Sequence, residues 1–142
     1  MDCTQYSNAL HRFKEMLDFY EDISSRKGGV VFEAVRESLA SRFEYALEIS
    51  WRTCRRHLCE QGFAEAATGS PKAIMRLAFA NALVSDISAW LGYVDARQGI
   101  AHDCAEENLD RVIACCPAFY RDACSLCMAL ASVADKETAP VK

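Results

Sequence analysis

A long amphipathic segment between about Val31 and Gln61 constrains the fold more than any other feature of the sequence. Apolar side chains recur along it every three or four residues, which is the period of one face of an α-helix. The stripe consists of Phe32, Val35, Leu39, Phe43, Ala46, Leu47, Cys54 and Leu58. Gly62 follows, and glycine commonly ends helices because it adopts positive φ without a steric penalty. We therefore expect one long helix, the longest in the chain.

The first half of the chain supplies two further helices. Apolar residues between positions 6 and 20 are spaced by four and three residues in turn, and turn-forming residues follow at 24–29. Residues 63–69 are small and predict a loop. Ser70 and Pro71 then mark a helix start, because serine is a good N-cap and proline is favoured in the first helical turn.

The second half is also helical in period. An apolar stripe from Ile87 to Val94 predicts a helix that Gly99 would end, and another is expected to begin at or just after Asp103. Pro117 predicts a kink or the first turn of a new helix. No segment alternates as a strand would. The expected fold class is all-α, an antiparallel up-and-down bundle of five to six helices joined by short connections.

Length and composition suit one domain over residues 1–142, with 51% hydrophobic and 25% charged residues. No apolar run approaches the roughly 20 residues that span a bilayer, and the N-terminus lacks the features of a secretion signal. We therefore expect a cytoplasmic protein. A net charge of −4 argues against a surface dedicated to non-specific nucleic-acid binding, although it leaves room for a small basic site.

Eight cysteines raise the alternatives of disulfides and zinc. Disulfides are disfavoured without a secretion signal. A zinc site could use Cys124 and Cys127, but both lie inside a helical pattern, whereas structural zinc ligands usually lie on turns. We expect the cysteines to pack as small hydrophobic residues, with no metal and no cofactor.

Arg97 and His102 are the candidate catalytic pair. A permanent cation and a titratable imidazole suit phosphate binding and proton transfer. Five residues at ~3.6 per turn place the two side chains about 140° apart in an unbroken helix. They can converge only if the chain turns near Gly99 or if two copies meet in a symmetric dimer.

Glu44, Glu48 and Arg52 follow one another at intervals of four residues, beside Trp51. One interpretation is an exposed ladder of ion pairs, worth a few tenths of a kcal/mol each. The other is a binding pocket with paired carboxylates and an aromatic wall. The sequence has no Asp-x-Asp pair, so it cannot by itself hold the two metal ions of a nucleotidyl-transfer site.

Three blocks in order carry a resemblance to a known family. They are RFEYALEISW from Arg42 to Trp51, SPKAIMRLAF from Ser70 to Phe79, and WLGYVDARQGIAH from Trp90 to His102. The set resembles the small helical substrate-binding (partner) subunits of minimal nucleotidyltransferases, in the wider HEPN superfamily. The similarity covers roughly residues 10–130.

The resemblance implies a homodimeric bundle that binds a small nucleotidyltransferase encoded alongside, often as a toxin–antitoxin pair. In toxic members Arg-x4-6-His forms a metal-independent ribonuclease site, which corresponds here to Arg97 and His102. The substrate-binding candidates are Glu44, Glu48, Trp51 and Gln98. Possible further ligands are a nucleotide or RNA, and no membrane is expected.

The chain departs from the family at two positions. The residue after the arginine is often asparagine and is Gln98 here, and the tyrosine that many toxic members have two residues after the histidine is Cys104. Both departures weaken the case for an active, nucleotide-controlled toxin more than the case for the fold or the partner. A non-catalytic partner subunit is thus the first hypothesis, a ribonuclease toxin the second, and a plain structural bundle the third.

Overall fold

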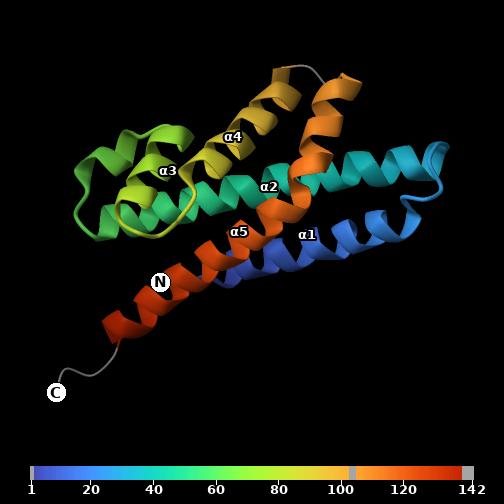
Figure 1. Cartoon of the computed structure of the whole chain (residues 1–142). Helices are drawn as coiled ribbons and strands as arrows, with labels where there is room; N and C mark the ends of the chain where they lie inside the picture. The colour runs from blue at the N-terminus through green and yellow to red at the C-terminus, as the bar shows by residue number, and fades with distance from the viewer. Residues whose placement is uncertain (1, 103–104, 139–142) are drawn as a thin grey trace.

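The computed structural model describes residues 2–102 and 105–138, and this part of the chain is all-α with no strand. The order is α1 (Thr4–Ile23), α2 (Val30–Glu60), the 3₁₀ turn η1 (Ala64–Thr68), α3 (Pro71–Ala80), α4 (Ile87–His102) and α5 (Glu106–Thr138). In Figure 1, α1 and α2 lie antiparallel, and α4 lies on the other side of α2 from α1. Within the described residues α2 contacts every other element, whereas α1 and α4 do not touch.

The core is centred on Phe119 of α5, which is fully buried. Its ring packs edge to face against four aromatic rings from the other three long helices, at centroid distances of 4.9–5.9 Å. Edge-to-face packing brings the positive ring edge to the negative ring face, and each such pair adds about 0.5–1.5 kcal/mol beyond area burial. The four partners are Phe13, Phe43, Trp90 and Tyr93.

A buried hydroxyl cluster aligns three of the helices. Tyr6 of α1 is buried, and its hydroxyl donates to the carbonyl of Ala123 in α5 at 3.2 Å. The same hydroxyl accepts a hydrogen bond from Ser50 of α2 at 2.8 Å. Burial raises the pKa of Tyr6 well above its usual value, so the hydroxyl stays protonated and able to donate.

Local signals in the first half of the sequence are confirmed. Gly62, just after α2, has a φ of +93°. Ser70 caps α3 by accepting from the backbone N–H of Ala73 at 3.2 Å, with Pro71 at the first helical position. The segment expected to be a plain loop contains η1 instead, because the buried side chain of Ala66 holds it against the core.

Two expectations about the lengths and ends of the helices are wrong. Gly99 does not end α4, which continues to His102. The side chain of Asn108 packs against this glycine: its amide donates to the Gly99 carbonyl, and a Cβ at position 99 would make a tight contact of 3.2 Å with its Oδ1. The longest helix is α5, with 33 residues against 31 in α2. Pro117 lies inside α5, which bends along its length in Figure 1, as helices do at proline.

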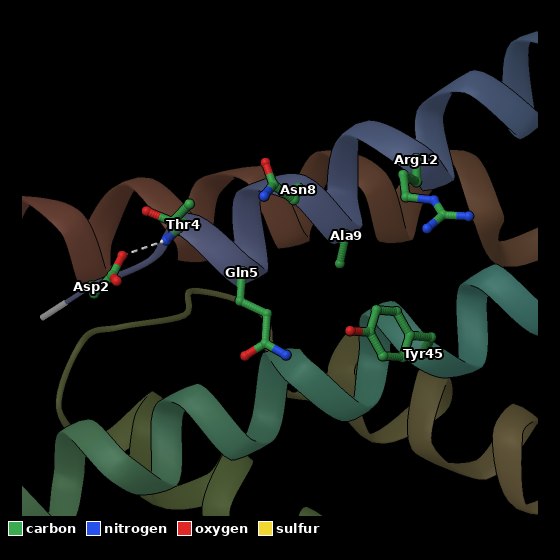
Figure 2. A pocket seen from close by; sticks show the side chains of 7 residues that line it. All are labelled: Asp2, Thr4, Gln5, Asn8, Ala9, Arg12 and Tyr45. Carbon is green, nitrogen blue, oxygen red and sulfur yellow. Dashed lines mark hydrogen bonds between the residues drawn. The ribbon is translucent and has the colours of Figure 1, made fainter.

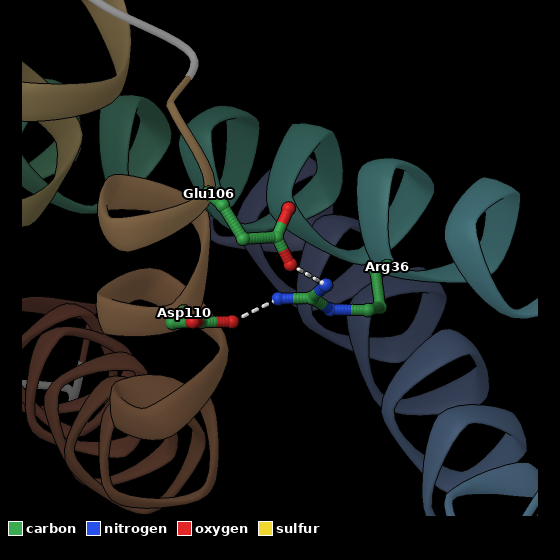
Figure 3. A network of polar contacts seen from close by, with 3 residues as sticks. All are labelled: Arg36, Glu106 and Asp110. Atoms are coloured by element: carbon green, nitrogen blue, oxygen red, sulfur yellow. Dashed lines mark hydrogen bonds and ion pairs between the residues drawn. The ribbon is translucent and has the colours of Figure 1, made fainter. Parts of the chain in front are cut away.

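Arg36 ties the start of α5 to α2, an interaction that the sequence did not indicate. Its side chain is only 9% exposed, and its guanidinium pairs with Glu106 and with Asp110 (Figure 3). Residues 106 and 110 are one helical turn apart, so a single guanidinium can bind both carboxylates. These ion pairs join the first turns of α5 to α2.

The segment Glu106–Ser132 of α5 is long and apolar enough to cross a membrane by length and composition alone. Its apolar residues have an alternative explanation in the fold, because those spaced three or four positions apart along the helix are buried in the core. These are Val112, Cys116, Phe119, Ala123, Leu126 and Leu130. The hydropathy of α5 therefore fits a core helix of the bundle.

Cys54 and Cys116 are buried in the core, as expected of cysteines that pack as small hydrophobic residues, whereas Cys59 is exposed and departs from that expectation. Burial raises the pKa of Cys54 to about 12 and that of Cys116 still further. The thiolate is the reactive form, so both sulfurs are inert as nucleophiles near neutral pH.

We expect thiol reactivity to follow this burial. At about pH 8 a disulfide exchange reagent should modify exposed Cys59 at least about 100-fold faster than Cys54, which has both little thiolate and no access to reagent. Peptide mass mapping over time gives the two rates. In denaturant the two rates should converge, and equal rates in the folded protein would contradict the packing.

Candidate functional site

Glu48 of α2 is the centre of the candidate site. Its Oε2 accepts from the indole Nε1 of Trp51 at 3.0 Å, and its Oε1 pairs with Nη2 of Arg52 at 2.8 Å. These partners lie one helical turn away, so the helix itself brings them together. Arg97 of α4 adds a fourth group, with its Nη2 3.7 Å from the same Oε2. Of the ladder expected from the sequence, the structure shows the Glu48–Arg52 ion pair, and Glu48 also pairs with a second helix through Arg97.

Trp51 forms the aromatic wall of this site. The guanidinium of Arg52 lies 5.7 Å from the indole centroid, and that of Arg55 lies 5.2 Å away. Cations over an aromatic face are attracted by its quadrupole, so the ring holds two positive charges near Glu48. Arg55 was missed in the sequence, although its spacing of four residues from Trp51 is the signal that could have found it.

The guanidinium of Arg97 has only part of its hydrogen-bonding capacity used in this arrangement. Its side chain is 35% exposed, and the distance of 3.7 Å to Glu48 is an ion pair too long for a good hydrogen bond. Its Nε atom is buried and has no hydrogen-bond partner among the described residues. Buried N–H groups rarely lack a partner. Because Nε itself is closed to solvent, an anionic ligand could reach this guanidinium only through the exposed part of the side chain.

His102 is not brought to Arg97 within one chain. The turn expected near Gly99 is absent, because α4 is continuous from Ile87 to His102. The two side chains therefore point about 140° apart on one helix. His102 is exposed at the C-terminal end of α4, Gln98 is exposed beside Arg97, and Cys104 lies outside the described residues.

Glu44 and Glu48 line different hollows, although they are one turn apart. Glu44 borders a hollow of about 340 Å³ with Glu37, Ile100 and Leu109, at the end of α4 and the start of α5. Glu48 borders one of about 470 Å³ whose walls include Arg52, Arg55 and Arg56. The Glu44 hollow lies toward α4 and α5, whereas the Glu48 hollow lies toward α1, whose Gln5 lines it together with Tyr45.

The Glu48 hollow can attract an anion. Three arginines line it against one carboxylate, and Gln5 of α1 and Tyr45 complete its polar wall. Guanidinium groups suit phosphate and carboxylate because they offer paired N–H donors. No cluster of three or more His, Cys, Asp or Glu that could hold a metal occurs within residues 2–102 and 105–138.

Comparison with known families matches residues 1–132 to the family described as nucleotidyltransferase substrate binding protein like. The fold is similar to HI0074 of Haemophilus influenzae, reported to reveal the fold of a substrate binding domain of a nucleotidyltransferase. That match has a TM-score of 0.81 at 21% identity, covering 92% of this chain and 99% of the other.

A second solved structure, from Thermus thermophilus, gives a TM-score of 0.64 at 24% identity and covers 83% of this chain and 98% of the other. At such identities both likenesses show the fold. No curated protein matches the chain.

We expect Arg97 to contribute little to stability. Arg97→Ala should lower the free energy of unfolding by less than about 1 kcal/mol, because the ion pair is long and partly exposed. Phe119→Ala should cost about 3–5 kcal/mol, because it empties the centre of the core. Urea titration followed by circular dichroism measures both. A loss of several kcal/mol in Arg97→Ala would mean that the arginine has a structural role.

Proposed function

The chain belongs to the family of nucleotidyltransferase substrate-binding proteins, and we propose that it is the partner subunit that holds the substrate of a nucleotidyltransferase through the Glu48 site. The observation that carries this proposal is the meeting of Glu48, Trp51 and Arg97 from two helices. A carboxylate, an indole ring and an incompletely satisfied guanidinium converge there at a partly exposed position.

Each group has a separate part in binding. Arg97 binds an anionic oxygen of the substrate, and Trp51 offers an apolar face for a flat or aliphatic portion. Glu48 orients both, because its Oε2 lies within reach of the indole N–H and of the guanidinium. The metal ions for nucleotidyl transfer come from the partner enzyme, since this chain has no Asp-x-Asp pair.

The assembly we propose is a homodimer bound to a nucleotidyltransferase encoded alongside, as a two-component, toxin–antitoxin-like module. Closed cyclic dimers are the commonest symmetric form of soluble proteins. Exposed apolar side chains near the α1–α2 turn offer candidate contact area; they are Phe19, Val30 and Val31. The HEPN relationship expected from the sequence belongs to the same proposal.

We expect Glu48→Gln to weaken substrate binding by the assembled complex about 10- to 100-fold. The amide keeps the size of the side chain but loses the charge that orients Arg97, and hydrogen bonds to charged groups are worth about 1.5–3 kcal/mol. Isothermal titration of the co-purified complex measures the affinity.

Glu60→Gln is the matched control, because it removes a carboxylate from the exposed end of the same helix. Co-purification with the partner should survive both changes. Equal affinities for the two variants would contradict the role of Glu48.

A ribonuclease is the second candidate, favoured by the exposure of His102 beyond Arg97 at the end of α4. Within one chain the two side chains diverge, so this hypothesis requires two copies that face each other across a dimer axis. His102 would then take the 2′-hydroxyl proton, and Arg97 would stabilise charge on the phosphorane.

If this chain is a ribonuclease, expression without the partner should arrest growth, and His102→Ala should abolish the arrest. Arg97→Lys should be nearly as damaging because lysine lacks the paired donors, and EDTA should not affect cleavage. His11→Ala is the control, since His11 is an exposed histidine on α1. Sedimentation equilibrium should show a dimer. Normal growth with the wild-type chain alone would eliminate this candidate.

A further inference from the structure

Tyr45 lies in a groove between α1 and α2 that extends from the Glu48 hollow toward Arg12 and Arg42, two residues that the proposed function does not use. Its ring is 53% exposed, and it faces α1 across the groove (Figure 2). Gln5 and Arg12 of α1 flank the ring on either side, with Ala9 between them. Tyr45 belongs to the same sequence block as Glu48, and the two residues line one hollow between them.

The hollow beside Tyr45 has a cationic wall. It measures about 330 Å³ and is lined by Ala9, Arg12, Ser41, Arg42 and Tyr45, with no carboxylate among them. Arg42 is held in place because its Nη1 donates to the backbone carbonyl of Arg12 at 2.6 Å. Within the described residues, neither arginine forms an ion pair with an acidic side chain.

Two unneutralised guanidinium groups at one hollow are unusual for this protein, whose net charge is −4. No carboxylate lines the hollow, so an anion there would be attracted by both guanidinium groups. The hydroxyls of Ser41 and Tyr45 add two neutral donors on the same wall. Paired guanidinium and hydroxyl donors are the set that binds a phosphate group well.

The adjoining hollow could accept the rest of a ligand. It measures about 450 Å³, shares Ala9, Arg12 and Tyr45 with the first, and adds the amides of Gln5 and Asn8 (Figure 2). Its one carboxylate, Asp2, lies at the far end and accepts from the backbone N–H of Thr4 at 2.9 Å. The amides offer both donors and acceptors, beside an exposed aromatic face.

We propose that the α1–α2 groove binds a phosphate group, with Arg12 and Arg42 as its cationic ligands and Ser41 and Tyr45 as hydroxyl donors. The phosphate is either free or carried by a small phosphate monoester whose remainder lies over Tyr45 and the amides. Arg12 and Arg42 do not line the Glu48 hollow, although that hollow adjoins the groove and shares Gln5 and Tyr45 with it. The inference goes beyond the proposed function, since it requires no partner enzyme.

The test is a titration of the purified chain at low salt with three probes. Inorganic phosphate, adenosine monophosphate and adenosine are added separately, and binding is followed by calorimetry and by amide chemical shifts. Phosphate or the monophosphate should bind and shift the amides of residues near Arg12 and Arg42, whereas adenosine should not bind. Tighter binding of the monophosphate than of phosphate identifies an ester as the ligand.

Three variants decide the role of the residues. Arg12→Gln should weaken binding about 10-fold or more, because it removes a charged hydrogen bond. Tyr45→Phe should have a smaller effect, and Arg76→Gln is the control because Arg76 is an exposed arginine on α3. Thermal unfolding verifies that each variant is folded. No binding by either phosphate probe at about 10 mM, equal binding by adenosine, or equal loss in Arg76→Gln would each overturn the proposal.

Discussion

The packing of four aromatic rings around Phe119 is the interaction on which the rest of the structure depends. Phe119 lies on α5, and its neighbours come from α1, α2 and α4, so one side chain sets the relative positions of all four long helices. Trp90 and Tyr93 are on the same helix as Arg97. Their packing against Phe119 therefore determines where α4 crosses α2, and this crossing brings Arg97 to Glu48.

The long helix α2 is shared by two surfaces of different chemistry. Toward α4 it presents Glu48 with Trp51 and Arg97, where a carboxylate and arginines balance each other in part. Toward α1 it presents Arg42, in a hollow without a carboxylate, and Tyr45, which lines both this hollow and that of Glu48. A helix buried by neighbours on two sides can hold both surfaces at a fixed distance, because its backbone is rigid over this length.

The sequence predicted the helices and most of the core, because apolar spacing and caps are local signals. It could not predict what depends on the approach of distant segments. Gly99 has the local signature of a helix end, yet it lies inside α4, where the side chain of Asn108 packs against it. Nothing near Arg36 in the sequence indicates its ion pairs, because Glu106 and Asp110 come from a distant segment that the fold brings beside it. For the candidate site, the Glu48–Arg52 spacing was visible in the sequence, but the contribution of Arg97 depends on how α4 crosses α2.

The buried hydroxyl of Tyr6 has a consequence for the uniqueness of the fold. Smooth apolar stripes allow neighbouring helices to slide past one another by a turn, since one leucine packs nearly as well as the next. Sliding α1 along α2 would remove the Tyr6 hydroxyl from Ser50 and from the Ala123 carbonyl, and would leave a buried polar group without a partner. A few buried hydrogen bonds thus favour one alignment of the three helices. The same alignment places Arg12 opposite Arg42, so a buried hydrogen bond of Tyr6 also determines which side chains meet on the surface of α1 and α2.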